Sequence, residues 1–163
     1  GRATRCVGVA RDITNRKRAE ETLRQSEERL RFLIESAEDY AIFTTTKDGV
    51  INSWNTGAEK IFGWTESEAL GQSGEIIFTP EDRAGKAPER EIKTALRKGR
   101  APDERFHLRK DGSRFFASGV MTLLRDANDK VRGFVKIARD MTAQREAEKA
   151  LREAELQRVR EQS

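Results

Sequence analysis

The arrangement of apolar and charged positions divides the chain into three parts. Residues 15–31 and 143–163 are almost entirely Arg, Lys, Glu, Gln and Ala, whereas the aromatic residues fall between Phe32 and Phe134. A stretch with so few apolar residues cannot build a core of its own and remains largely solvated. We therefore expect one folded core of roughly a hundred residues between two helical arms that stay in solvent.

Within the core, short β-rich runs are separated by turns and helical segments. Asp-Gly pairs and similar turns separate five expected strands, over residues 41–46, 50–54, 104–109, 113–124 and 131–139. Three helices are expected between the second and third strands: one capped by Asn55, one opened by a Thr65–Glu68 capping box, and one over Glu89–Lys98 that Gly99 closes. The order β-β-α-α-α-β-β-β predicts an α+β domain in which helices interrupt one antiparallel sheet.

The two arms carry partial heptad patterns. In the first arm, Leu23 and Leu30 lie seven residues apart and Leu33 follows three residues later. This spacing predicts a linker helix over residues 15–37 that pairs with a second copy, so we expect a homodimer through Leu23, Leu30 and Leu33. Polar gaps in the stripe predict marginal pairing. The second arm, residues 143–163, has a weaker stripe and is expected to be a C-terminal output helix, again coiled-coil-like.

A short passage occurs twice in the chain. Residues 9–14 read Val-Ala-Arg-Asp-Ile-Thr and residues 137–142 read Ile-Ala-Arg-Asp-Met-Thr, at an offset of 128 residues. Each copy joins a strand-like run to a charged helical run through Asp-x-Thr, which is typical of tandem modules. We expect residues 1–14 to be the last strand, and so the tail, of a preceding module, and residues 38–142 to form one complete module. Thr142 is expected to be the N-cap of the following helix.

The net charge of +4 and the pI near 9.4 do not predict a nucleic-acid partner. In the arms, Lys and Arg alternate with nearly as many Glu residues, which makes helix-face ion pairs and no stripe of a single sign. The single cysteine, Cys6, excludes an internal disulfide and a cysteine-rich metal site, and no metal site is expected. No apolar run approaches eighteen residues, so no membrane contact is expected from this chain. We expect a cytoplasmic setting, although Gly1 reads as a cut within a longer protein that could be membrane-anchored elsewhere.

Two stretches of the core resemble a known family. The run from Asn52 to Trp64, Asn-Ser-Trp-Asn-Thr-Gly-Ala-Glu-Lys-Ile-Phe-Gly-Trp, resembles the N-x-A-x-E-x-x-x-G-Y stretch of PAS sensor domains. Arg109-Lys110-Asp111-Gly112-Ser113 and the closing Gly133…Arg139-Asp140-Met141-Thr142 resemble the C-terminal half of that family, its PAC motif. The likeness covers residues 25–145. It implies a five-stranded antiparallel sheet with short helices over one face, around a small cavity.

The resemblance also implies a signalling role. Such domains usually sit in tandem upstream of histidine kinases or cyclic-di-nucleotide enzymes. This chain contains neither a kinase histidine motif nor a nucleotide-binding glycine loop, so we expect no catalysis from it and place it in a sensor histidine kinase of a bacterial two-component system. We expect a non-catalytic sensory and signal-relay module. The alternatives are a ligand-free dimerisation or protein-interaction spacer, and a module upstream of a cyclic-di-GMP enzyme.

The resembled family includes flavin, haem and small-anion sensors, and each of these chemistries needs particular residues. Flavin photosensors of the family form a cysteine adduct, but the matching position here is Gly74, which leaves non-covalent flavin binding as the open alternative. Haem sensors hang iron from a histidine on the helix that corresponds to Glu89–Lys98, which has no such ligand, and His107 is expected to be a surface or sheet-packing residue. Small-anion sensors collect basic side chains, for which the candidates are Arg97, Arg105 and Arg109, although all three are expected to reach water. We expect no cofactor, and these residues indicate no particular small-molecule ligand.

Two candidate sites remain. The first is an apolar pocket, whose alternative is a filled core without a ligand; its expected lining residues are Phe43, Ile61, Ile77, Ile92, Phe106 and Phe116. The second is the junction at Asp140 and Thr142, where the last strand becomes the output helix. A strand fused to a helix can pass a shift of tilt or register into it, and simple helix capping is the alternative role for this pair.

Overall fold

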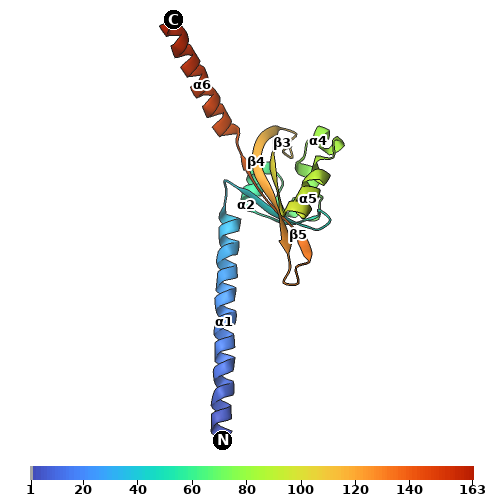
Figure 1. Ribbon diagram of the computed structural model, residues 1–163, viewed down its shortest axis with the longest axis vertical. Helices are drawn as coiled ribbons and strands as arrows, with labels where there is room; N and C mark the ends of the chain where they lie inside the picture. The colour runs from blue at the N-terminus through green and yellow to red at the C-terminus, as the bar shows by residue number, and fades with distance from the viewer. Residues whose placement is uncertain (1) are drawn as a thin grey trace. The chain divides into compact units, whose positions relative to one another are not determined.

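The computed structural model describes the backbone of residues 2–163 and the side chains of residues 11–163. Two compact units make up the chain, Gly1–Ser36 and Ala37–Ser163. The first unit consists of the helix α1 (Arg2–Ser36) (Figure 1). Its side chains from residue 11 onward are exposed. Among the helices that the structure describes, none combines the length and the apolar character that a bilayer-spanning helix needs.

The expectation of a strand within residues 1–14 is wrong for the described part of that range, because the chain is helical from Arg2 onward. A lone strand leaves its N–H and C=O groups without partners, whereas a helix pairs them within the segment. The assignment of this stretch to the tail of a preceding module stays a prediction.

The second unit is built on one five-stranded antiparallel sheet in the order β2-β1-β5-β4-β3, and the predicted α+β class is confirmed. The strands are β1 (Ala41–Thr46), β2 (Ile51–Trp54), β3 (Arg100–Leu108), β4 (Arg114–Arg125) and β5 (Val131–Asp140). The last strand in sequence, β5, lies in the centre and pairs with β1 on one side and β4 on the other. The inward side chains of β5 are therefore flanked by residues of β1 on one side and of β4 on the other.

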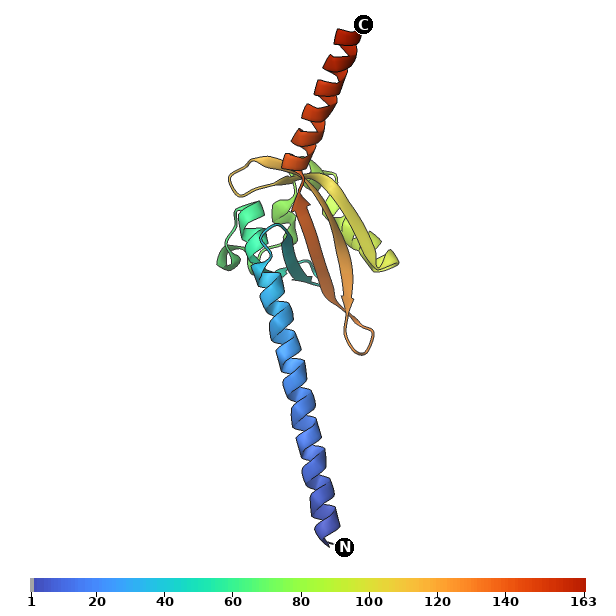
Figure 2. The same ribbon diagram turned by 90° about the vertical axis from the view of Figure 1, so that its left-hand side faces the viewer.

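The short helices follow β2 in sequence and gather over one face of the sheet (Figures 1 and 2). They are α2 (Thr56–Phe62), α3 (Glu66–Ala69), the 3-10 turn η1 (Gly74–Ile77), α4 (Pro80–Ala84) and α5 (Ala87–Lys98). A further helix, α6 (Thr142–Gln162), follows β5 directly.

Local sequence signals account for several helix ends. Gly63 and Gly99 end α2 and α5 in the left-handed conformation, with φ of 84° and 86°, which glycine adopts without steric cost. Thr65 and Glu68 form the expected capping box at α3. A hydrogen bond from Lys110, with further bonds from Thr65, lowers the pKa of Glu68 to about 2, which keeps this capping carboxylate charged.

Asn55 joins the start of the sheet to α2. Its Oδ1 accepts hydrogen bonds from Ile42 N at 2.9 Å and from Ala58 N at 2.8 Å. Its Nδ2 donates to Ala37 O at 3.2 Å and Tyr40 O at 3.1 Å. One buried amide therefore fixes the helix N-terminus, the first strand and the segment that leads into it.

The core lies between the sheet and the helices. Aromatic rings fill one end, where Phe43 and Trp54 lie 5.0 Å apart between centroids and Phe62 lies 5.5 Å from Phe115. A smaller apolar cluster beneath α5 contains Ala95, Ala101, Met121 and Phe134. A cavity lies where these two clusters meet.

Candidate functional site

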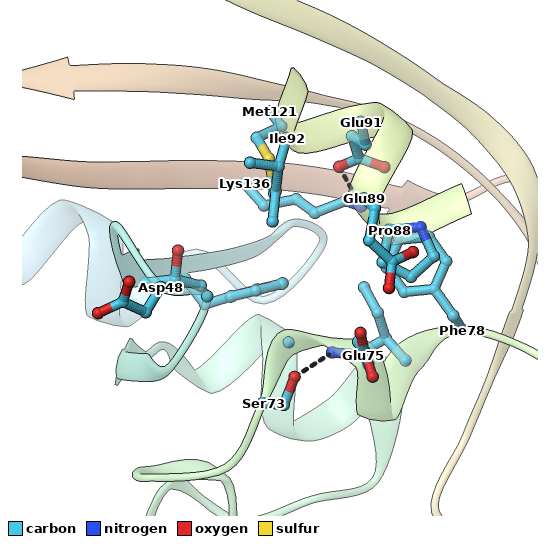
Figure 3. A pocket seen from close by; sticks show the side chains of 15 residues that line it. Asp48, Ser73, Glu75, Phe78, Pro88, Glu89, Glu91, Ile92, Met121 and Lys136 are labelled. Atoms are coloured by element: carbon cyan, nitrogen blue, oxygen red, sulfur yellow. Dashed lines mark hydrogen bonds and ion pairs between the residues drawn. The ribbon is translucent and has the colours of Figure 1, made fainter. Parts of the chain in front are cut away.

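A cavity of about 70 Å³ opens between the sheet, η1 and α5 (Figure 3). Three strands supply its floor: Lys136 of β5 is paired with Phe43 of β1 and with Met121 of β4, and all three line the space. Ile77 of η1 and Ile92 of α5 add apolar surface. The register of the sheet therefore aligns residues of three neighbouring strands side by side beneath the cavity.

A buried lysine ties α5 to the sheet at this cavity. Lys136 Nζ lies 2.7 Å from Glu91 Oε1 and 2.6 Å from Asp103 Oδ2, and all three side chains are almost fully buried. The ammonium also lies 4.7 Å from the centre of the Phe78 ring, within the range of a cation–π contact. A buried ammonium between two carboxylates is compensated in charge, which makes this burial sustainable.

Asp103 carries a second set of contacts. Its Oδ2 lies 2.6 Å from His107 Nε2, and its Oδ1 accepts from Arg105 Nε. The other ring nitrogen of His107 lies 2.9 Å from Ile77 O, on the wall of the cavity. A neutral ring has one N–H and donates to only one of these two oxygens, so protonation would add a second hydrogen bond.

Burial and neighbouring charges raise the pKa of Glu91 and lower the pKa values of Asp103 and His107. Burial raises the pKa of Glu91, against the opposing pull of the Lys136 ammonium. Burial also acts to raise the pKa of Asp103, but the His107 hydrogen bond and the Lys136 ammonium outweigh it and hold the pKa well below its usual range. Burial lowers the pKa of His107, which its bond to Asp103 opposes.

Two carboxylate oxygens in the cavity wall lack a hydrogen-bond partner. Across residues 11–163, the buried side-chain atoms without one are Trp64 Nε1, Glu89 Oε2 and Glu91 Oε2. Glu89 and Glu91 both line the cavity from α5 (Figure 3). An unpaired oxygen in such a place costs free energy, so it marks a position where a donor would bind.

Three of the six predicted pocket residues line this cavity. Phe43, Ile77 and Ile92 line the cavity. Ile61 is buried in the core cluster and outside the lining. These positions share the apolar character that the pattern detects, but only three of them reach the space itself.

The expectation that Phe106 and Phe116 line the pocket is wrong, since both lie on the face of the sheet opposite the cavity. They pair across β3 and β4 with ring centroids 5.3 Å apart, and Arg145 of α6 lies 4.1 Å from the Phe116 ring centre. The reason is the phase of β3: His107 points inward, so its neighbour Phe106 points outward and is half exposed. His107 is a fully buried packing residue.

The three arginine candidates do not converge on the cavity. Arg97 is exposed on α5, Arg105 pairs with Asp103, and Arg109 Nη2 lies 2.7 Å from Asp140 Oδ2. None of them belongs to the lining. The only lining cation within the described residues is Lys136, which sequence reasoning missed.

The cysteine-adduct flavin chemistry and the haem chemistry of the family do not fit the residues present. Gly74, at the position of the adduct cysteine, lines the cavity without a thiol. From α5 the lining receives Pro88, Glu89, Glu91 and Ile92 and no haem ligand, while both ring nitrogens of His107 face protein oxygens. A cavity of about 70 Å³ is also smaller than the roughly 150 Å³ that holds a single benzene ring in an apolar core.

The junction between β5 and α6 is held by Asp140. Its Oδ1 accepts from Thr142 N at 2.9 Å, and its Oδ2 accepts from Arg109. The expectation that Thr142 is the N-cap is wrong, because α6 begins at Thr142 and its N-cap residue, Met141, makes no side-chain cap bond. The carboxylate of Asp140, two residues upstream, instead accepts a hydrogen bond from the backbone N–H of Thr142, which has no partner within the helix.

Comparison with known proteins places this fold in a family. The family model described as the PAS fold matches residues 28–141, and the chain belongs to the PAS family. The predicted resemblance is thereby confirmed. A crystal structure of a PAS domain from Colwellia psychrerythraea superposes with a TM-score of 0.65 at 25% identity, covering 75% of this chain and 98% of that one.

Two curated relatives are signalling proteins. Two-component system protein A of Emericella nidulans is 39% identical over 121 residues, which are 74% of this chain and 18% of that protein. Sensor protein FixL of Bradyrhizobium diazoefficiens is 36% identical over 84 residues, covering 52% of this chain and 16% of that protein. The chain thus spans less than a fifth of the length of either relative, and it is a PAS sensory domain of the kind that signalling proteins carry.

Proposed function

We propose that this chain is a non-catalytic sensory and relay module of a bacterial sensor histidine kinase, and that it passes a change in its cavity to α6. Support for the kinase comes from the relatives, one named as a two-component system protein and the other as a sensor protein. A blue-light-activated histidine kinase from Erythrobacter litoralis shares the fold at 22% identity and a TM-score of 0.56. The proposal includes a cytoplasmic setting and a homodimer, and it places phosphotransfer in another part of the full-length protein.

The observation that carries the relay is the course of β5. This strand holds Lys136 in the cavity wall and, at its end, Asp140 at the start of α6. Arg109 reinforces the junction, since its Nε donates to Ile61 O while its Nη2 binds Asp140. A shift of β5 or α2 therefore reaches the hydrogen bond that begins the output helix.

The test is hydrogen exchange of the first-turn amides of α6 in the 163-residue chain. Ile92→Phe fills the cavity and is expected to change that exchange, whereas Leu96→Phe, exposed on the same helix, is the matched control and should not. Asp140→Ala should speed exchange about fivefold, as expected for a lost cap worth about 1 kcal/mol, and should remove the response to Ile92→Phe.

An unchanged α6 in the Ile92→Phe variant would contradict the relay. It would favour the alternative of a ligand-free dimerisation spacer, in which the cavity and the output helix are independent.

A further inference from the structure

The unpaired oxygens of Glu89 and Glu91 indicate what kind of molecule the cavity accepts. Glu91 is 5% exposed, and only its Oε1 is used by Lys136. We propose that the cavity binds a small organic cation, a short-chain primary ammonium, whose N–H groups pair with these two carboxylates. This inference deepens the proposed sensory function and rests on it.

The charge of the lining favours a cation over an anion. Four of the lining residues are carboxylates, Asp48, Glu75, Glu89 and Glu91, and the single ammonium is Lys136. Lys136 is already compensated by Glu91 and Asp103. Asp48 and Glu75 are exposed and enter no ion pair among the described residues, so the outer part of the lining carries uncompensated negative charge, which attracts cations.

The size and the walls of the cavity limit the rest of the ligand. About 70 Å³ leaves room for only a few non-hydrogen atoms. Phe43, Ile77 and Met121 offer hydrocarbon surface beside the carboxylates, which suits an alkyl chain. A hydrated metal ion would gain nothing from these walls, because hard cations prefer a shell of oxygen ligands.

The experiment compares three probes of one shape and different charge: n-propylammonium, n-propanol and propionate. Each is titrated into the isotopically labelled 163-residue chain at pH 7, and amide and methyl NMR shifts are followed at Ile77, Ile92 and Met121. We expect saturable shifts with n-propylammonium, at least about tenfold weaker binding of n-propanol and none of propionate. Equal or tighter binding of n-propanol or propionate, or no shift with n-propylammonium, overturns the proposal.

Variants assign the effect to the two carboxylates. Glu89→Gln keeps the shape and removes the charge, and because Glu89 has no ion pair among the described residues, the fold should be retained. It should weaken n-propylammonium binding about tenfold, and Glu91→Gln should do the same where it folds. Glu153→Gln, exposed on α6, is the matched control. Unchanged affinity in Glu89→Gln overturns the proposal.

The same samples separate this inference from the relay. If n-propylammonium binds but the exchange of α6 does not change, the ligand class stands and the relay fails. If n-propanol or propionate is the probe that binds and changes α6, the relay stands and the ligand class fails.

Discussion

Lys136 shows how one residue can be both structural and part of the site. Its ammonium lies on the central strand between Glu91 and Asp103, and water reaches almost none of it. Removing such a group leaves two buried carboxylates without their common partner. The cost comes mainly from those uncompensated charges, since a well-packed apolar replacement of a whole ion pair is often neutral.

We expect Lys136→Met to lower the free energy of unfolding by about 3–5 kcal/mol, measured by urea denaturation at pH 7. Lys149→Met, exposed on α6, is the matched control and should change it by less than about 0.5 kcal/mol. Adding Glu91→Met to Lys136→Met should recover part of the loss, because one stranded carboxylate is removed. Fully additive losses would show that the two side chains are not coupled.

The site could be predicted only in part, because at some positions the residue type indicates exposure while the place in the strand pattern indicates burial. Phe43, Ile77 and Ile92 were found because large apolar residues in a strand or helix pattern are usually inside. Lys136 and Asp103 were missed because charged residues are usually outside. The available signal was strand phase: Phe134, Lys136 and Ala138 share the buried face of β5.

At the scale of elements, Asn55 is the joint between β1, α2 and the segment before the sheet. Four of its hydrogen bonds use both ends of the amide group: the oxygen accepts two of them and the nitrogen donates two. A carboxylate of the same shape keeps the acceptor and turns an oxygen toward two carbonyl oxygens. The substitution therefore isolates the donor half of the joint.

Asn55→Asp is expected to destabilise the fold by about 2–4 kcal/mol at pH 7, measured as a lower urea midpoint with an unchanged slope. Asn128→Asp, in the exposed β4–β5 turn, carries the same change of charge and should stay within about 0.5 kcal/mol of the parent. Equal stability of the two variants would mean that the donor half of Asn55 contributes nothing.

The elements themselves were largely predictable because their ends carry local chemistry. Gly63, Gly99 and the Thr65–Glu68 box lie where the helix boundaries were expected. The error over residues 1–14 has a different cause. Strand-like composition encodes a strand only where a neighbouring strand completes its hydrogen bonds, and no sheet is available to α1 within the first unit.

At the scale of the whole molecule, α1 carries an apolar stripe with nothing over it in its own unit. Leu23, Leu30 and Leu33 are each about 60% exposed. These are the residues whose heptad spacing predicts a dimer seam. The stripe is short, so pairing of two copies should be weak enough to respond to concentration.

We expect the chain to sediment as a concentration-dependent monomer–dimer mixture. Leu30→Lys should raise the dissociation constant at least about tenfold, because a buried apolar contact is exchanged for a charge opposite its own copy. Gln25→Lys adds the same charge off the stripe and should leave the equilibrium nearly unchanged. A parent chain that sediments as a monomer at every concentration would refute the homodimer.

The central place of β5 has a consequence for biosynthesis. Until Val131–Asp140 has left the ribosome, β1–β2 and β3–β4 are two hairpins with no ladder in common, each with an open inner edge. Ala41 meets its neighbour Ala138 only after about a hundred residues have been translated. The sheet of the nascent domain can thus close only after its last strand has been made, and until then the inner edges of β1 and β4 stay open to pairing with other chains.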